Sequence, residues 1–405
     1  MHKTLPPLPV LDCTGCSACA SICQSNAISM CENNEGFLYP FINKDLCIKC
    51  QQCARICPAL TPVSKHPLKE GKHFIAQYTD SYTRQKSASG GAFAGIATDV
   101  ILNRQGVVFG ASLCKDLVVR HIMIDKCELI TRLQNSKYVQ SDINDSYKIA
   151  KEQLDANRLV FFTGTPCQIA GLYSYLGKEY KNLLTADIIC HGVPSPRLWK
   201  RYCAECSRSW MGKVESARFR YKNPFFKSGS SFYMVMRMSK GPVVVRKAVN
   251  DFYFNTFLKG FVFREACYRC TYASIERIGD FTLGDCDSRK DYPEFHPNES
   301  NSTLMINTHK AYLLWKEGLE NAFDYKELDI RGEAKHNKQL NAPFPRPDCR
   351  SNIYSDLDSM EWNDFIKQYY TKTGILSRLV LLIACYAPPA LIRVLIKLKN
   401  ILHHL

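Results

Sequence analysis

The sequence has little that would direct it out of the cell or into a common nucleotide-binding fold. Its first residues, MHKTLPPLPVLDC, contain no apolar run of the length that a signal peptide needs. We therefore expect the chain in the cytoplasm, a reducing compartment in which free thiols persist. No G-x-G-x-x-G motif follows an expected strand, which argues against a Rossmann nucleotide site.

Long hydrophobic runs are also missing, and so are acidic residues near the end of the chain. Residues 374–405 contain no Asp or Glu, and the fourteen uncharged residues between Arg378 and Arg393 are too few to span a bilayer as a helix. Two interpretations of this basic, apolar tail stay open. Either it lies on the anionic inner face of the membrane as a peripheral contact, or it packs on the protein body or a second subunit.

Cysteine, in contrast, is abundant. Nine of the 20 cysteines fall within residues 13–57, and this clustering indicates metal binding rather than disulfides. The stretches LDCTGCSACASICQSN (11–26) and LCIKCQQCARICPAL (46–60) both have the spacing C-x2-C-x2-C-x3-C. Two such runs are typical of a bacterial-type ferredoxin with two 4Fe-4S clusters, in which the fourth cysteine of each run ligates the other cluster. One cluster is then held by Cys13, Cys16, Cys19 and Cys57, and the other by Cys47, Cys50, Cys53 and Cys23.

Two other uses of these thiols fit the pattern less well. Structural zinc favours pairs of C-x2-C with four ligands per site, and it would leave the third cysteine of each run unexplained. Disulfides between neighbours on such tight loops have poor geometry, and the expected compartment is reducing. Cys31 lies between the runs, has no place in either ligand set and is expected to be a bystander.

The formal net charge of +15 invites a nucleic-acid interpretation, which we disfavour. The basic residues are scattered, and each oxidised cubane with its thiolates would add about two negative charges that a count of side chains ignores. The remaining excess would attract an acidic protein, a polyanionic cofactor or an anionic membrane surface.

The rest of the chain predicts an α/β (α+β) fold. HFIAQY (73–78), RLVFF (158–162) and LLTADII (183–189) have the composition of buried strands. SASGGAFAGIATDVIL (87–102) is typical of a glycine-rich turn that opens a helix. We expect a small ferredoxin-like dicluster domain over residues 1–62, a larger mixed α/β domain over 73–350 and a helical tail over 351–405.

Six motifs of the larger domain resemble those of a known family. They are SASGG (87–91), SKYVQS (136–141), FTGTPCQIAGL (162–172), DIICHGVPSP (187–196), ACYRCTYA (266–273) and GDFTLGD (279–285). In this order they resemble the beta subunits of coenzyme F420 hydrogenases and dehydrogenases. That family includes chlorophyllide reductases and bacterial proteins linked to envelope-polysaccharide synthesis. The resemblance extends from residue 10 to about residue 350.

The resemblance implies a flavoprotein, normally with FAD, and makes the larger domain the flavin-binding one. A flavin is also the expected converter between cubanes, which move one electron, and substrates that exchange two. Bare N–H groups before a helix can receive a pyrophosphate, although the SASGG turn also fits an ordinary helix N-cap. The cofactor-binding candidates are Ser89, Gly90 and Gly91, followed by Lys137, Thr163, Gly164 and Thr165.

A third 4Fe-4S cluster is the sharper of two hypotheses for the downstream cysteines. The resemblance implies a further cubane in this domain, with the ligands Cys167, Cys190, Cys267 and Cys270. Cys167 is expected at a helix start, where the dipole favours the thiolate. The competing interpretation makes Cys167 and Cys190 small buried hydrophobes. Cys203 and Cys206 also form a C-x2-C, but on an expected helix outside the family motifs, which favours a structural role.

The leading hypothesis is an iron-sulfur, flavin-dependent oxidoreductase. It would pass electrons between 4Fe-4S clusters and a two-electron small-molecule substrate through FAD, with ferredoxin or another redox protein as partner. A second hypothesis is a non-catalytic electron-transfer subunit of a larger redox complex, and a third is a zinc-stabilised interaction module. No catalytic residue is identified, because His191 is expected to be a hydrogen-bonded turn residue. Cys286 and Asp287 replace bulky residues of the relatives, which leaves the substrate and the use of coenzyme F420 open.

Overall fold

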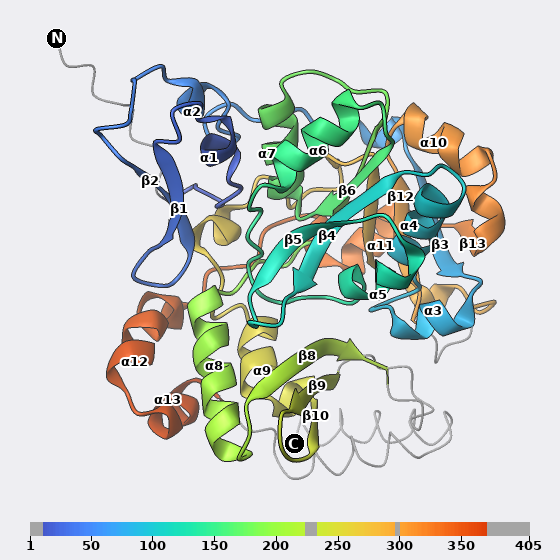
Figure 1. The fold of residues 1–405 in the computed structure, drawn as a ribbon. Helices are drawn as coiled ribbons and strands as arrows, with labels where there is room; N and C mark the ends of the chain where they lie inside the picture. Colours follow the sequence, from blue (N-terminus) through green and yellow to red (C-terminus); the bar gives the residue numbers. More distant parts are fainter. Residues whose placement is uncertain (1–10, 223–232, 296–299, 371–405) are drawn as a thin grey trace.

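The computed structural model describes residues 11–222, 233–295 and 300–370 of the chain (Figure 1). A small N-terminal domain lies at one end of a larger α/β body, and a second, three-stranded sheet lies below the main sheet in this view. The basic, apolar tail of residues 374–405 lies outside the described residues. In the described part of the chain, no helix is both long and apolar enough to cross a membrane.

The two cysteine runs of the small domain fold into matching turns. Gly15 and Lys49 both have a positive φ, of 69° and 55°, and so do Ser17 and Gln51, at 64° and 63°. The repeat in the sequence is therefore a repeat of backbone conformation. Each turn leads into a short helix that begins one residue before the third cysteine of its run. The elements of this domain are α1 (Ala18–Ile22), the antiparallel strands β1 (Ile28–Glu32) and β2 (Leu38–Ile42), and α2 (Gln52–Arg55).

The main sheet of the larger domain is mixed. Its eight strands follow the spatial order β13 (Phe323–Glu327), β3 (Lys72–Tyr78), β12 (Ser302–Ile306), β11 (Phe281–Asp285), β7 (Leu183–Ile188), β6 (Val160–Gly164), β4 (Val107–Leu113) and β5 (Val119–Ile124). Strands β11, β7, β6 and β4 are parallel to their neighbours in this group, and the outer pairs are antiparallel. The expected strands at 73–78, 158–162 and 183–189 are confirmed as β3, β6 and β7.

Two adjacent phenylalanines of β6 show why this strand is apolar throughout. Phe161 packs in a core with α4, whereas Phe162 packs in another core with α6 and α7. Neighbouring side chains of a strand point to opposite faces, so both faces of the sheet are covered. The second core also contains Ala18 of α1, so the small domain packs on the larger one. The helices around the sheet are α3 (Ser81–Lys86), α4 (Ala92–Leu102), α5 (Ile130–Leu133), α6 (Ser146–Asp155), α7 (Pro166–Leu176), α10 (His309–Lys316) and α11 (Ile330–His336).

The second sheet has a largely aromatic core, to which Trp199, Tyr202, Phe219 and Tyr253 contribute. Its antiparallel strands are β10 (Val243–Lys247), β9 (Tyr233–Met238) and β8 (Val214–Tyr221), in that order. The helices that pack here are α8 (Pro196–Ser209), α9 (Phe252–Leu258), α12 (Ile353–Ser359) and α13 (Trp362–Tyr369). Short 3-10 helices are η1 (Leu68–Glu70), η2 (Cys127–Leu129), η3 (Ala248–Asn250), η4 (Glu265–Arg269), η5 (Arg289–Asp291), η6 (Leu319–Ala322), η7 (Lys338–Leu340) and η8 (Asp348–Ser351).

The carboxyl ends of the parallel strands meet at one edge of the main sheet. Gly164 ends β6, Ile188 ends β7 and Asp285 ends β11. The segments that follow the first two of these strands carry Cys167 and Cys190. Strand β3 runs in the same direction as β11, because both are antiparallel to β12, so the turn before α4 also belongs to this side. Ligand sites of open α/β sheets form at such an edge.

Candidate functional site

The four thiols predicted for the first cluster lie together in the small domain. Cys16 interacts electrostatically with Cys13 and Cys57, and Cys19 interacts with all three. Burial raises the pKa of the Cys16 thiol to about 12, although the residue is only half-buried. A raised pKa together with partial exposure is expected where side chains line an enclosed recess. Free thiols would stay protonated there, whereas coordination to iron deprotonates a thiol outright, so the group fits a cluster.

The thiols predicted for the second cluster also lie together, but closer to solvent. Cys53 interacts electrostatically with Cys50, Cys23 and Cys47, and Cys50 is exposed. Partial burial opposes ionisation of Cys23, yet hydrogen bonds from the Ser25 side chain and from backbone amides lower its pKa below the usual value. The crossing of Cys23 and Cys57 between the two sets therefore agrees with the interleaved arrangement.

The four downstream cysteines form a third group at the edge of the main sheet. Cys190 interacts electrostatically with Cys267, Cys167 and Cys270. All four cysteines are half-buried. Burial raises the pKa of each thiol, to about 11 for Cys167 and about 12 for Cys267. Cys167 lies at the start of α7, as expected, where the helix dipole favours a thiolate. Burial acts in the opposite direction and raises the pKa of the free thiol.

The third group touches the first one. Cys16 packs on α7 at Gly171, where an added Cβ would lie 3.1 Å from the Cys16 sulfur. The Cys16 and Cys167 thiols interact electrostatically. Within the residues that the structure describes, no three or more His, Cys, Asp or Glu side chains are close enough to hold a single metal ion. The ligands of a cubane surround a whole iron-sulfide core and are spaced more widely than those of one ion.

The remaining cysteines that were considered lie apart from these groups. Cys31 is exposed on β1 beside Ser29, as expected of a bystander. Cys203 and Cys206 are buried on α8 in the aromatic core, which fits the structural role expected for this C-x2-C. Cys286 is buried against Glu333 of α11, whose carboxylate accepts hydrogen bonds from the backbone after β11.

The end of strand β8 places three basic side chains against the SASGG segment and the last residue of helix α3 before it. They are Arg218, Arg220 and Lys222, and we call them the basic strip. The hydrogen bonds run from Arg218 Nη2 to the Lys86 carbonyl at 3.1 Å, from Arg220 Nη2 to the Ala88 carbonyl at 3.1 Å, and from Lys222 Nζ to the Ser89 carbonyl at 2.6 Å. The basic strip was not predicted from the sequence, although basic residues at every second position of ARFRYKN (217–223) indicate one positively charged face of a strand. Arg220 also pairs with Asp285 at the end of β11, at 2.8 Å.

Three titratable side chains near the basic strip have shifted pKa values. Lys137 is half-buried and donates to the Leu133 carbonyl at 2.8 Å, and burial and the nearby Arg218 lower its pKa to about 7. Desolvation lowers the pKa of His191 despite the proximity of Asp285. Desolvation together with Asp285 raises the pKa of Asp287 to about 6.

The glycine-rich turn is packed closely against the protein itself. Gly91 has a φ of 89° and is the N-cap of α4, where no side chain forms a capping hydrogen bond. Gly90 packs so tightly that a Cβ would lie 2.3 Å from the Ala76 carbonyl oxygen. The Ser89 hydroxyl is 3.0 Å from that of Ser302 on β12.

The other cofactor candidates, Thr163 to Thr165, lie in a different place. The Thr163 hydroxyl donates to the Phe109 carbonyl inside the sheet, at 2.9 Å. Thr165 forms a capping box at the start of α7, and its hydroxyl is 3.1 Å from the Cys167 sulfur. A Cβ on Gly164 would meet Gln168 of that capping box. These residues therefore adjoin the third thiol group rather than the SASGG turn.

Two families of known proteins match parts of the chain. Residues 157–329 match the family described as the C terminus of the coenzyme F420 hydrogenase/dehydrogenase beta subunit, and residues 12–60 match the 4Fe-4S dicluster domain. This chain joins the C-terminal domain of the F420 hydrogenase/dehydrogenase beta-subunit family to an N-terminal 4Fe-4S dicluster domain. A chain in a xenon-derivatised structure of the F420-reducing NiFe hydrogenase complex from Methanosarcina barkeri is 14% identical, with a TM-score of 0.44. The match covers 70% of this chain and 97% of that one. The curated proteins include no match.

The dicluster match supports two 4Fe-4S clusters in the small domain. The beta-subunit match contains all four cysteines of the third group, the basic strip and Asp285. The SASGG turn and Lys137 precede it. The three basic side chains of the strip gather positive charge beside the SASGG turn, which fits a polyanionic cofactor such as FAD, and Asp285 is the ion-pair partner of Arg220.

Proposed function

We propose that this protein is an iron-sulfur flavoenzyme that transfers electrons between a redox partner protein and a small two-electron substrate, with FAD as the carrier between them. The observation that supports this proposal is a continuous series of sites. The second thiol group is the most exposed, the first is adjacent to it, and the third adjoins the first at Cys16. The series ends beside the basic strip.

The order of the groups gives the electron path. Each cysteine run contributes its last thiol to the other group, so the two groups of the small domain lie side by side. Cys167 and Cys190 follow adjacent parallel strands, and His191 extends from the third group toward Asp285 and Arg220. We assign a third 4Fe-4S cluster to Cys167, Cys190, Cys267 and Cys270.

FAD would lie at the carboxyl edge of the main sheet. Bound there, it would supply the conversion between single electrons and a pair. The basic strip would neutralise the pyrophosphate, and the uncapped N-terminus of α4 would offer backbone N–H groups. The substrate would react beside Asp285 and Asp287.

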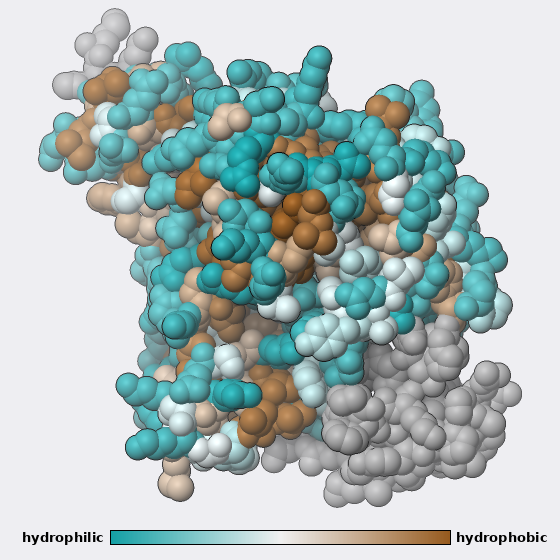
Figure 2. All heavy atoms as spheres, turned by 45° about the vertical axis from the view of Figure 1, so that its right-hand side comes forward, coloured by the Kyte–Doolittle hydropathy of each residue, from teal (hydrophilic) through white to brown (hydrophobic). Residues whose placement is uncertain are grey.

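The exposed end of the series suits docking of a ferredoxin or another redox protein. Phe41, Leu46 and Ile48 are 61%, 51% and 67% exposed and flank the second thiol group along the chain. Figure 2 shows hydrophobic side chains among hydrophilic ones at the upper left, where the small domain lies. Apolar side chains around an exposed redox centre provide a contact surface without a long electron-transfer distance.

Anaerobic purification followed by assays of iron, acid-labile sulfide and flavin tests the proposal. About twelve irons per chain with bound FAD is the expected result, and about eight irons would remove the third cluster. Zinc without sulfide would overturn the proposal in favour of an interaction module. Full iron content with no flavin after reconstitution would instead favour the electron-transfer subunit of a larger complex.

A further inference from the structure

Arg264 connects the third thiol group with the first. Its backbone N–H donates to the Val193 carbonyl at 3.0 Å, in the segment that follows Cys190. Its carbonyl accepts from the N–H of Cys267 at 2.9 Å. Arg264 also interacts electrostatically with Cys167. The residue is therefore fixed among the ligands proposed for the third cluster.

The side chain of Arg264 extends from the third thiol group to the small domain. Nε donates to the Cys13 carbonyl at 2.6 Å, Nη1 donates to the Leu38 carbonyl at 2.9 Å, and Nη2 lies 3.5 Å from the Cys13 sulfur. The guanidinium stacks over the Tyr39 ring, 3.9 Å from its centroid. Gly15 leaves room for it, because a Cβ there would lie 2.9 Å from Nη1. The residue has a relative exposure of 1%.

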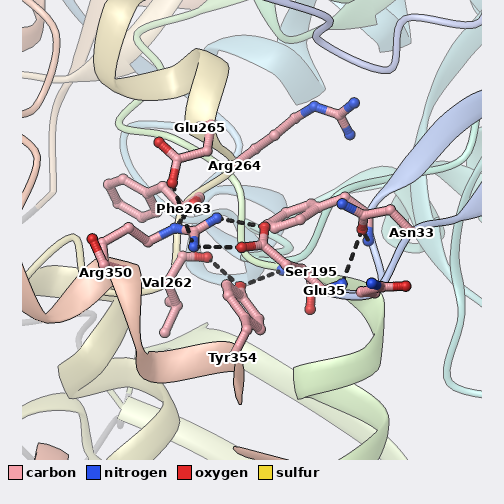
Figure 3. A network of polar contacts seen from close by, with 12 residues as sticks. Asn33, Glu35, Ser195, Val262, Phe263, Arg264, Glu265, Arg350 and Tyr354 are labelled. Carbon is pink, nitrogen blue, oxygen red and sulfur yellow. Dashed lines mark hydrogen bonds and ion pairs between the residues drawn. The ribbon is translucent and has the colours of Figure 1, made fainter. Parts of the chain in front are cut away.

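The charge of Arg264 is balanced differently from that of other buried arginines. Three of these pair with a carboxylate: Arg220 with Asp285 at 2.8 Å, Arg277 with Asp187 at 2.8 Å and Arg350 with Glu35 at 2.6 Å. Across the described ranges, no carboxylate lies within ion-pair distance of Arg264. Figure 3 shows its side chain pointing away from the neighbouring pair of Arg350 and Glu35. A buried charge is costly without an opposite charge close by.

We propose that the iron-sulfur clusters are the counter-ions of Arg264 and that its guanidinium, held at the Cys13 sulfur, raises the reduction potential of the cluster in the first thiol group. This inference rests on the proposed function, because it assumes that the cysteine groups carry clusters. Charge and hydrogen bonds to the sulfurs set cluster potentials, and a buried charge is weakly screened by salt. Arg264 is thus a positioning residue that favours an electron on the first cluster, next to the third.

Replacing Arg264 and measuring the potential of each cluster tests this role. In Arg264→Gln, an EPR-monitored redox titration should give a more negative potential for the first cluster and an unchanged potential for the exposed second cluster. Arg264→Lys keeps the charge but loses the planar set of hydrogen-bond donors. The potential of its first cluster should therefore lie between those of Arg264→Gln and the wild type. Arg350→Gln is the matched control, since Arg350 is also buried and also joins the two domains, and its side-chain hydrogen bonds within the described part of the chain go to Phe263 and Glu35 rather than to a cysteine.

The result that overturns the inference is an unchanged first-cluster potential in fully loaded Arg264→Gln, or the same shift in Arg350→Gln. If Arg264→Gln fails to load iron, the redox titration of Arg264→Lys replaces it as the test. A first-cluster potential equal to that of the wild type in Arg264→Lys would then overturn the inference. Iron, sulfide and flavin assays on the same preparations separate the two proposals. A wild-type protein without iron would contradict both the proposed function and the role of Arg264. An iron-loaded flavoprotein whose potentials do not shift on replacement would contradict only the role of Arg264.

Discussion

Cys16 packs directly on Gly171 of helix α7, and an added Cβ at position 171 would lie 2.9 Å from the Cys16 Cβ. Cys167 precedes Gly171 by four residues, so both lie on the same face of the helix. One turn of α7 therefore contacts a ligand proposed for the first cluster and supplies one proposed for the third. The close approach of the two groups depends on a residue with no side chain.

Gly171→Ala should lower the free energy of unfolding of the loaded protein by about 1–3 kcal/mol, because the added methyl group overpacks the contact. The sign of this change in the free energy of unfolding is informative, because replacing glycine with alanine in an exposed helix stabilises the helix by up to about 1 kcal/mol. Anaerobic thermal or denaturant unfolding gives the measurement. Ser174→Ala, at a half-buried position of the same helix, is the control and should change stability little. A stabilised Gly171→Ala protein would contradict the packing.

Cys270→Ser should lower the iron content by about four atoms per chain and leave the two clusters of the small domain in place. The reason is that Cys270 belongs to the third group and not to either cysteine run. Iron and sulfide assays with EPR spectra of the reduced protein measure the effect. Cys206→Ser, in the buried C-x2-C of α8, should retain full iron content. Equal iron content in both variants would eliminate the third cluster.

Local patterns in the sequence were sufficient for much of the fold and of the small domain. The apolar run before Gly164 predicts β6 because both faces of that strand are buried. The tandem cysteine spacing predicts which thiols come together, because the same backbone turn is repeated at Gly15 and Lys49. The turns and the strand depend on neighbours a few residues apart, so they can be inferred without knowing the tertiary contacts. The exchange of Cys23 and Cys57 between the groups was inferred from what is typical of tandem cysteine runs.

Features that depend on distant contacts could not be predicted in the same way. Strand β8 pairs with β9 through two register irregularities, which break the alternation that identifies a strand. The role of Arg264 depends on Cys13, which lies 251 residues away in the sequence. The depth of burial of Cys167 could not be predicted either, because the sequence shows the helix start but not the contacts around it.

Lys222→Gln should weaken FAD binding by about tenfold or more, as expected for the loss of a charge-assisted hydrogen-bonding group. Lys222 Nζ lies at the SASGG turn, with hydrogen bonds to the Ser89 and Arg84 carbonyls. Titration of the flavin-depleted, iron-loaded protein with FAD gives the dissociation constant. Arg237→Gln removes an exposed charge from the adjacent strand β9 and should leave that constant unchanged. Equal affinities in the two variants would place the cofactor elsewhere.

His121 should make the protein less stable as the pH falls from about 6.5 to about 4. Burial lowers the pKa of His121 to about 4, partly offset by its hydrogen bond to the Thr163 carbonyl, while Nδ1 has no partner among the described residues. The unfolded chain takes up a proton near pH 6.5 and the folded chain only near pH 4. In this window the unfolded state holds more protons, so acid favours unfolding, by about 1.4 kcal/mol per pH unit.

Denaturant unfolding of wild type and His121→Phe across this pH range checks the slope. Phenylalanine retains a ring against Phe162, whose centroid lies 5.5 Å from that of His121, but cannot take up a proton. The stability of His121→Phe should therefore fall less steeply with acid, even if the lost hydrogen bond lowers it at every pH. His309→Gln, at an exposed position of α10, is the control and should keep the slope of the wild type. A His121→Phe slope equal to that of the wild type would show that folding does not lower the pKa of His121.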